Sequence, residues 1–236
     1  MTVQVDAASG IAELAAIFAD RSRASMCVAL LDGRAWTAGE LAKYAGIARS
    51  TATEHLNLLV AADVLAEERQ GRHRYLRLAG TEIAELIETL AAHTPPSREH
   101  PRTLRTVTTQ AALARARTCY DHIAGWLGVA VTDAMTDQDM LTRHDGWTLT
   151  ASGLGWLRDL GADTEALRRT RRPMVRSCLD WTERRPHLAG AAGAAVCSRF
   201  FEIGWTERIG SNRAIRLTAP GEAALLNQLN LRWSSL

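Results

Sequence analysis

The stretch that decides the fold is Trp36-Thr-Ala-Gly-Glu-Leu-Ala-Lys-Tyr-Ala-Gly46-Ile-Ala-Arg-Ser-Thr-Ala-Thr-Glu-His-Leu56. Thr37 followed three residues later by Glu40 is the pattern of a capping box at the start of a helix. Gly46 suits the left-handed position that ends a helix. After a three-residue turn, a second helix is predicted to begin at Ser50. Two helices joined by a short turn predict a helix-turn-helix, in which the second helix lies across the major groove of DNA.

The flanking sequence extends this pattern on both sides. Apolar residues at helical spacing predict helices over 11–19 and 22–31. Residues 64–69 and 73–78 alternate as strands do, and the Gln70-Gly71-Arg72 turn joins them into a hairpin with a basic tip. A helix over 81–93 completes the module. A helix-turn-helix followed by a basic hairpin predicts a winged helix, whose wing contacts the DNA backbone or the minor groove.

The side chains expected to face double-stranded DNA are mostly short polar groups or arginines, which reach base edges and phosphates. They are Arg49, Ser50, Thr51, Thr53, Glu54, His55 and Asn57 on the second helix, and Arg69, Arg72, His73 and Arg74 on the hairpin. Lys43 is the only lysine, so nearly all the positive charge is arginine. The planar guanidinium fork suits phosphate and guanine.

Residues 11–90 resemble the ArsR-type (ArsR/SmtB) winged helix-turn-helix regulators. Ala19-Asp-Arg-Ser-Arg23 is similar to the family's ADPTR segment, and residues 46–56 are similar to its GLSQSTVSRHL recognition helix. Ala61-Ala-Asp-Val-Leu65 is similar to EAGLV, with Asp63 as a left-handed substitute for glycine. The resemblance implies a sequence-specific transcriptional regulator. It also implies a homodimer, formed by the first and last helices, on a palindromic operator with half-sites ~34 Å apart.

The chain departs from the family in two respects. Glu54 stands where the family has a basic residue, and Asn57 where it often has lysine, so we expect the wing arginines to contribute more of the affinity. The family's metal sites also lack their ligands, because residues 37–46 contain no cysteine and residues 81–93 contain the single histidine His93. Any effector is therefore expected to bind elsewhere.

The length of 236 residues and a hydrophobic content of 47% predict two domains. We expect a DNA-binding and dimerisation domain over 1–93, a proline-containing linker over 94–104 and an effector domain over 105–236. The sequence contains no apolar run of membrane-spanning length and no basic leader, which predicts a cytoplasmic protein without a membrane partner. Four widely spaced cysteines without a CxxC pair predict reduced thiols.

The C-terminal half is predicted to be mainly α-helical with a small β-hairpin wing. Its expected elements are a long helix over about 105–135, a strand over 147–150, a helix over 151–160 and a helix over about 187–203. Residues 205–217 repeat the pattern of residues 66–78, with Glu, Arg, Gly, Arg, Arg and Leu recurring in register. This repeat predicts a second, degenerate winged-helix domain.

The same half contains the candidate effector residues. On the predicted long helix, Cys119 and His122 share a face and suit a soft metal ion, and Cys178, Asp180 and His187 are candidate further ligands. Tryptophans are candidates to line an organic-ligand pocket, although core packing is their commoner role. The full candidate set is Cys119, His122, Trp126, Cys178, Trp181 and His187.

Two hypotheses of function follow. The first is a repressor released by an effector bound in the C-terminal domain. The alternative is a metal- or thiol-responsive regulator that uses Cys119, His122 and Cys178, and a buried Cys–His pair without a ligand also remains open. The sequence contains no Gly-rich phosphate loop, GxSxG or HExxH motif, so we expect no catalytic site, no enzyme activity and no required cofactor. A metal ion is the candidate bound group.

Overall fold

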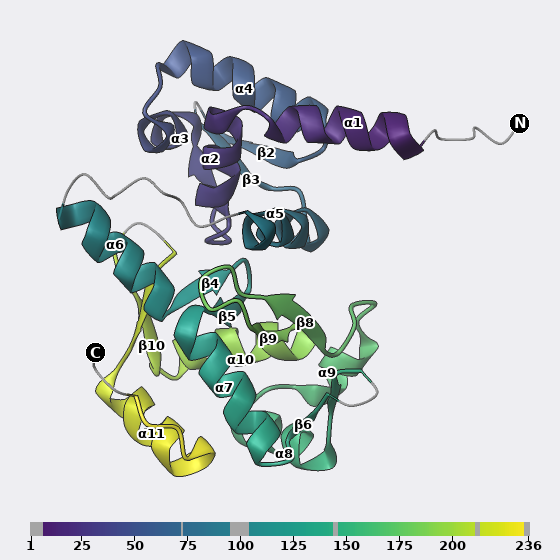
Figure 1. Cartoon of the computed structure of the whole chain (residues 1–236), viewed down its shortest axis with the longest axis vertical. Coiled ribbons are helices and arrows are strands. Elements are labelled where there is room, and N and C mark those ends of the chain that lie inside the picture. The colour runs from purple at the N-terminus through teal and green to yellow at the C-terminus, as the bar shows by residue number, and fades with distance from the viewer. Residues whose placement is uncertain (1–6, 72, 95–103, 144–145, 211–212, 234–236) are drawn as a thin grey trace, which may run out of the picture. The chain divides into compact units, whose positions relative to one another are not determined.

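A computed structural model describes residues 7–71, 73–94, 104–143, 146–210 and 213–233, with the backbone alone for residues 104–107. The chain divides into two compact units, Met1–Ile87 and Glu88–Leu236, which are described separately (Figure 1). Arg72 at the wing tip and residues 95–103 of the predicted linker lie outside the described residues. Within the described ranges, no helix has the length and apolar character needed to cross a membrane.

The first unit is a winged helix-turn-helix, as predicted. Its elements in chain order are α1 (Ala7–Phe18), α2 (Arg21–Leu30), β1 (Trp36–Thr37), α3 (Ala38–Ala45), α4 (Arg49–Ala61), β2 (Leu65–Gln70) and β3 (His73–Leu78), followed by α5 (Thr81–His93). The strands form an antiparallel sheet in the order β1-β3-β2. Strands β2 and β3 pair from Leu65↔Leu78 to Gln70↔His73, which confirms the predicted wing.

The predicted start and end of α3 are confirmed by their caps. The Thr37 side chain accepts from the Glu40 backbone N–H, and the Glu40 carboxylate accepts from the Thr37 N–H at 2.8 Å. Gly46 has a φ of 69° and Asp63 a φ of 54°, so both adopt the left-handed conformation that the sequence required. Helix α4 begins at Arg49, one residue before the predicted Ser50, and has no side-chain cap bond at its start.

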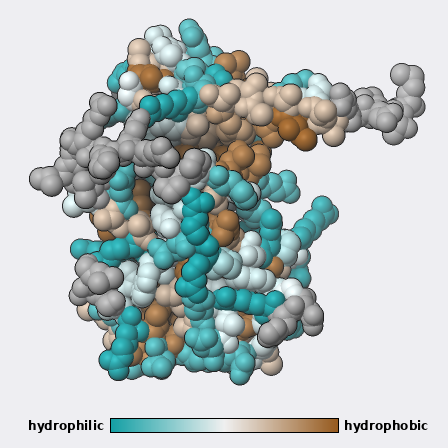
Figure 2. All heavy atoms as spheres, in the orientation of Figure 1, coloured by the Kyte–Doolittle hydropathy of each residue, from teal (hydrophilic) through white to brown (hydrophobic). Residues whose placement is uncertain are grey.

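The core of the first unit forms where the apolar faces of α2, α3, α4 and the wing meet. Met26, Leu41, Leu56 and Leu76 are all fully buried there. Helix α1 differs, because none of its residues is buried and Ile11 is 70% exposed. Figure 2 shows hydrophobic atoms along α1, so this helix presents an unpartnered apolar face in the single chain.

The second unit contains an internal duplication of a hairpin–helix–hairpin–helix motif. The first copy comprises β4 (Arg117–Cys119), β5 (His122–Ala124), α7 (Gly125–Asp137), β6 (Leu141–Thr142), β7 (Thr148–Leu149) and α8 (Ala151–Asp159). The second comprises β8 (Arg176–Leu179), β9 (Pro186–Ala189), α10 (Gly190–Glu202), β10 (Thr206–Arg208), β11 (Ile215–Leu217) and α11 (Ala219–Leu229). Helix α6 (Leu104–Arg115) precedes the first copy, and α9 (Thr164–Arg169) lies between the two.

The two copies share one hydrophobic core. It includes Leu127 and Met135 of α7, Val196 and Phe200 of α10, and Trp156 of α8. The predicted hairpin within residues 205–217 is present as β10 and β11, paired from Thr206↔Leu217 to Arg208↔Ile215. The pair β6–β7 occupies the equivalent place in the first copy, so each copy carries its own small wing.

Two predicted helices of this unit were wrong in extent. The helix expected over 105–135 is interrupted by the β4–β5 hairpin, whose turn places Tyr120 at a φ of 58°. Helix α7 then begins at Gly125, which has a φ of 74° and whose added Cβ would lie 2.7 Å from the Ala114 carbonyl oxygen. The helix expected over 187–203 begins at Gly190, because residues 186–189 pair with β8. Both segments are rich in apolar residues, so their hairpins were mistaken for helix.

Candidate functional site

The residues expected to read DNA lie on α4 and the wing of the first unit. Arg49, Ser50, Thr53, Glu54 and Asn57 are exposed on α4. Thr51 and His55 on the same helix are half-buried, and Arg69 and His73 are exposed on the wing.

Two of these residues are also held within the unit. The His55 ring lies 3.3 Å from an Arg23 guanidinium nitrogen on α2. Arg74 donates to the Asn57 side-chain oxygen at 2.8 Å and to the Glu67 carboxylate at 2.7 Å. Arg74 therefore ties the wing to α4, whereas the Arg69 side chain is 76% exposed and its guanidinium lies 3.7 Å from the Glu67 carboxylate.

The second unit brings together four residues that were separate in the sequence. Cys119 of β4 pairs directly opposite His122 of β5, and Cys178 of β8 pairs directly opposite His187 of β9. The expectation that Cys119 and His122 share a helix face is wrong, because the hairpin places them across from each other on neighbouring strands. Each copy of the duplicated motif thus contributes one cysteine and one histidine.

These four residues form one compact cluster. One ligand atom from each of Cys119, His122, Cys178 and His187 lies within 4.8 Å of the others. The two sulfur atoms are 3.9 Å apart, and the two imidazole rings stack with centroids 5.0 Å apart. Zn–S bonds of about 2.3 Å in a tetrahedron place two sulfurs about 3.8 Å apart. The sulfur spacing therefore matches that of a Cys₂His₂ metal centre.

An aspartate lies near each histidine ring, but only one of the two is within hydrogen-bond distance. Nδ1 of His122 lies 3.2 Å from Asp121, whereas Nδ1 of His187 lies 3.9 Å from Asp180. Nε2 of His122 and both ring nitrogens of His187 are buried and have no hydrogen-bond partner in the described part of the chain. A carboxylate at one ring nitrogen, which is usual for a metal-bound histidine, is therefore present at His122 alone, and the buried nitrogens without partners are available to a metal ion.

Each aspartate is in turn held by an arginine. Arg172 donates two hydrogen bonds to Asp121, and the fully buried Arg117 donates to Asp180 at 2.8 Å. Asp180 also accepts the Gly125 backbone N–H at 2.6 Å. Asp180, a candidate ligand from the sequence, is thus held by Arg117 and Gly125 and is not a member of the cluster.

The electrostatics of the cluster favour a thiolate at Cys178, whereas burial raises the pKa of the Cys119 thiol well above its usual value. The Cys119 thiol, together with the rings of His122 and His187, lowers the pKa of the Cys178 thiol against the opposing effect of burial. Burial lowers the pKa of His122, but the Asp121 carboxylate and Cys178 outweigh it and raise that pKa to about 9. When no metal ion is bound, the positive charge of a protonated imidazole neutralises the negative charge of the thiolate beside it.

Two glycines allow the copies to approach each other. A Cβ added to Gly193 of α10 would lie 2.6 Å from the Leu188 carbonyl oxygen and 3.3 Å from His122 Cβ. A Cβ added to Gly128 of α7 would lie 2.3 Å from the Ile123 carbonyl oxygen and 3.7 Å from His187 Cβ. Each glycine thus sits beside the histidine of the other copy.

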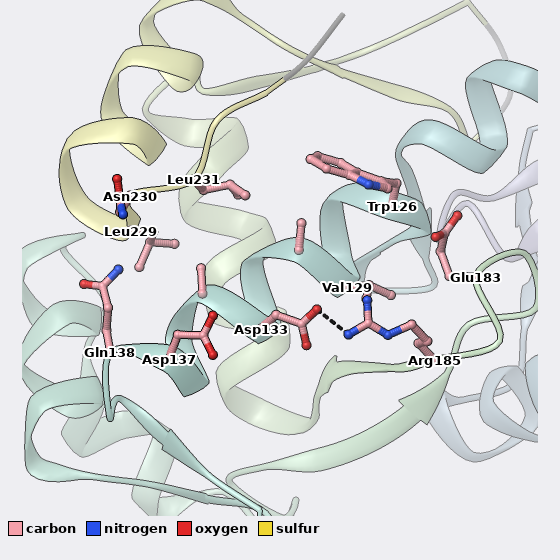
Figure 3. Close-up of a pocket in the computed structure, with 12 residues that line it drawn as sticks. Trp126, Val129, Asp133, Asp137, Gln138, Glu183, Arg185, Leu229, Asn230 and Leu231 are labelled. Carbon is pink, nitrogen blue, oxygen red and sulfur yellow. Dashed lines mark hydrogen bonds and ion pairs between the residues drawn. The ribbon is translucent and has the colours of Figure 1, made fainter. Parts of the chain in front are cut away.

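The two candidate tryptophans lie outside the cluster. Trp126 lines a cleft of about 430 Å³ together with Asp133, Glu183 and Arg185, in which Arg185 pairs with Asp133 at 2.7 Å (Figure 3). The Trp181 ring packs against the Arg117 guanidinium at 4.7 Å. Trp126 therefore lines an open cleft, while Trp181 covers the buried arginine that holds Asp180.

The sequence carries a signal for this duplication that spacing arguments missed. Arg-x-Cys-x-Asp occurs at 117–121 and again at 176–180, and His-x-x-Gly-x-x-Gly occurs at 122–128 and at 187–193. The second copy has six additional residues between its two halves, which hides the repeat. Asp121 and Arg172 were missed because their roles depend on contacts between segments distant in the chain.

Comparisons with known proteins agree with this architecture. Residues 18–68 match the family model described as a helix-turn-helix domain. The HTH-type transcriptional regulator YdfF of Bacillus subtilis (strain 168), itself described as uncharacterized, is 40% identical over 223 residues, covering 94% of this chain and 98% of YdfF. The chain belongs to the HTH-type transcriptional regulators. The match to YdfF is long enough to include both units.

Other relatives match a shorter part of the chain, about as long as the first unit. CmtR of Mycobacterium tuberculosis is 33% identical over 88 residues, covering 36% of this chain and 74% of CmtR. The solution structure of Mb0332 from Mycobacterium bovis, titled a homodimeric winged helix-turn-helix domain and possible ArsR-family regulator, is 22% identical, with a TM-score of 0.35 over 43% of this chain and all of that one. The ArsR-type resemblance is confirmed, and the curated relatives are named HTH-type transcriptional regulators.

Proposed function

We propose that this HTH-type regulator is a repressor that binds a palindromic operator as a homodimer and is released when a metal ion occupies the Cys₂His₂ cluster. The observation that carries the metal proposal is the placing of four ligand atoms within 4.8 Å of one another. The metal-responsive alternative from the sequence is thereby favoured, with His187 added as a fourth ligand.

The donor set selects the class of metal. Two thiolates and two neutral imidazoles suit a borderline-soft divalent ion such as Zn²⁺, and the two thiolate charges neutralise it. His122 and His187 are at most 2% exposed, so the ion would be bound without an open coordination position. Four protein ligands are typical of a structural or regulatory metal and leave no place for a substrate.

The homodimer is supported by the surface of the first unit. Helix α1 exposes Ile11, and Leu14 and Ile17 of the same helix line a cleft with Leu58 of α4. Apolar side chains of this kind are covered when a second copy packs against them. A two-fold dimer would place two α4 helices at neighbouring major-groove half-sites.

The Trp126 cleft supports an organic effector as a second candidate. Its volume lies within the range of ligand pockets, and its carboxylates Asp133, Asp137 and Glu183 outnumber its one arginine, Arg185. An aromatic wall beside net negative charge suits an organic cation. Quenching of Trp126 fluorescence by such a compound, absent in Trp126→Phe, is the expected signature.

The metal proposal is tested by metal content and DNA affinity together. We expect wild-type protein to bind one Zn²⁺ per chain by elemental analysis, and Cys119→Ser and His187→Ala to lose it. Cys197→Ala is the matched control, because Cys197 is a buried cysteine of the same unit outside the cluster. Protein that binds no zinc after incubation with excess Zn²⁺ would contradict the metal site.

The regulatory role requires a separate measurement. An operator selected from a random-sequence library would be titrated with metal-free and zinc-loaded protein by fluorescence anisotropy. A coupling of about 1–3 kcal/mol corresponds to a roughly 5- to 150-fold weaker affinity with zinc. Equal affinities, with zinc stoichiometrically bound, would assign the ion to stability alone and refute release by metal.

A further inference from the structure

The two sulfur atoms of the cluster are unusually placed for a pair of free cysteines. Cys119 and Cys178 have their Sγ atoms 3.9 Å apart, and a disulfide requires about 2.05 Å. Cys178 lies on β8, whose neighbouring residues Ser177 and Leu179 are exposed, and is itself half-buried. Cys119 is only 1% exposed. Cys178 is therefore the more exposed of the two cysteines, and the Cys119 sulfur lies within reach of it.

We propose that Cys178 and Cys119 form an oxidation site for hydroperoxides, at which disulfide formation expels the metal ion. This inference rests on the metal site proposed above and names how that site is regulated. Both sulfurs are thiolates while they hold the metal ion; Cys178, the more exposed of the two, meets the oxidant, and Cys119 is the resolving residue. The protein thereby responds to peroxide as well as to metal.

The reaction proceeds in two balanced steps. The Cys178 sulfur attacks one oxygen of hydrogen peroxide, an S–O bond forms, the O–O bond breaks, and the departing hydroxide takes a proton from solvent to become water. The Cys119 thiolate then attacks the Cys178 sulfur, an S–S bond forms and the S–O bond breaks, releasing a second hydroxide that is also protonated. Two thiolates lose two electrons, and one peroxide becomes two waters.

Expulsion of the ion follows from the change in donors. Thiolate sulfur is the ligand form of cysteine, and a disulfide sulfur carries no charge to neutralise Zn²⁺. The ion would retain only the imidazoles of His122 and His187. A site that loses two of four ligands and both negative charges no longer holds a divalent ion tightly.

The other two cysteines lack these features. Cys27 and Cys197 are at most 4% exposed, and burial raises the pKa of each thiol to about 12. They therefore remain protonated at neutral pH and react slowly with peroxide. This contrast supplies an internal control within one chain.

The experiment follows zinc and thiols in the same sample. Full-length protein loaded with one Zn²⁺ is treated with hydrogen peroxide, and released zinc is measured with a chromophoric chelator while disulfides are located by peptide mass spectrometry. We expect one zinc released per Cys119–Cys178 disulfide, two of four thiols lost, and rebinding of zinc after reduction with dithiothreitol. The Cys27→Ala/Cys197→Ala double variant, which keeps only the cluster cysteines, should behave as wild type does.

The outcomes separate this inference from the proposed function. Zinc retained while peroxide is in excess, or zinc released with Cys178 oxidised but unlinked to Cys119, overturns the inference and leaves the metal site intact. Protein that takes up no zinc before peroxide is added overturns the proposed metal site. In that case the peptide map still decides whether Cys119 and Cys178 form a disulfide.

Discussion

Removing zinc from the second unit should lower its melting temperature by roughly 8–16 °C. The metal joins the hairpin of one copy to the hairpin of the other, and Cys119 and Cys178 are 59 positions apart in the chain. A cross-link that closes a loop of this length lowers the entropy of the unfolded chain by an amount worth about 4 kcal/mol at 25 °C. In a unit of about 150 residues, each kcal/mol shifts the melting temperature by roughly 2–4 °C.

The assay is differential scanning calorimetry on zinc-loaded protein and on the same protein after dialysis against a chelator. Cys119→Ser/Cys178→Ser, which leaves only the two histidines, should melt at the same temperature in both conditions. Cys27→Ala alters a fully buried residue of the first unit and should keep the full chelator effect. Equal melting temperatures with and without the chelator, while elemental analysis shows the zinc removed, would refute the cross-link argument.

Three further predictions concern the glycine contact, the wing and the capping box. Gly193→Ala should lower zinc affinity with all four ligands present, because its Cβ would lie 2.6 Å from the Leu188 carbonyl oxygen and 3.3 Å from His122 Cβ and would displace the backbone next to His187 at a cost of about 1–3 kcal/mol. Gly155→Ala, which meets no close atom, should not; a competition titration with a chelator compares them. Arg69→Ala should reduce the slope of log affinity against log salt by ~0.9 per half-site, and an unchanged slope would remove Arg69 from the phosphate contacts. Thr37→Ala should destabilise the first unit by about 1 kcal/mol in urea titrations at pH 7. The Thr37 backbone and side chain lower the pKa of Glu40. The contribution of Glu40 to the free energy of unfolding is therefore complete above the ordinary carboxyl pKa of about 4.3 and is lost as the pH falls through the lower pKa of the folded state. A loss of this stability when the pH is raised would contradict the argument.

The first unit was predictable because its signals are local. Thr37 and Glu40 are three residues apart, Gly46 follows the same helix, and the wing strands are joined by a short turn. Backbone capping and hairpin pairing act over a few residues, so the order of residue types was enough to give the elements and their boundaries. What these signals do not predict is the bond between Arg74 and Asn57, which joins the wing to α4.

The second unit was less predictable because its decisive contacts are long-range. The apolar stripe over 105–135 suits a helix as well as it suits buried hairpins, and only Gly125 and the turn at Tyr120 mark the break. The repeated Arg-x-Cys-x-Asp and His-x-x-Gly-x-x-Gly segments were available in the sequence. These repeated segments form a cluster only because the two copies pack against each other, and contacts between residues so far apart in the chain cannot be read from local sequence patterns.

The sequence by itself therefore determined the winged helix-turn-helix. It also identified the cysteines and histidines of the second unit as candidate ligands of one site. The tertiary structure decided that Cys119, His122, Cys178 and His187 meet at one point. It also decided that Asp121 hydrogen-bonds to the His122 ring and that Asp180 binds the buried Arg117. The physical reason is range: helix caps and turns are stabilised by neighbours in the chain, whereas a four-ligand site requires two hairpins more than fifty residues apart to pack face to face.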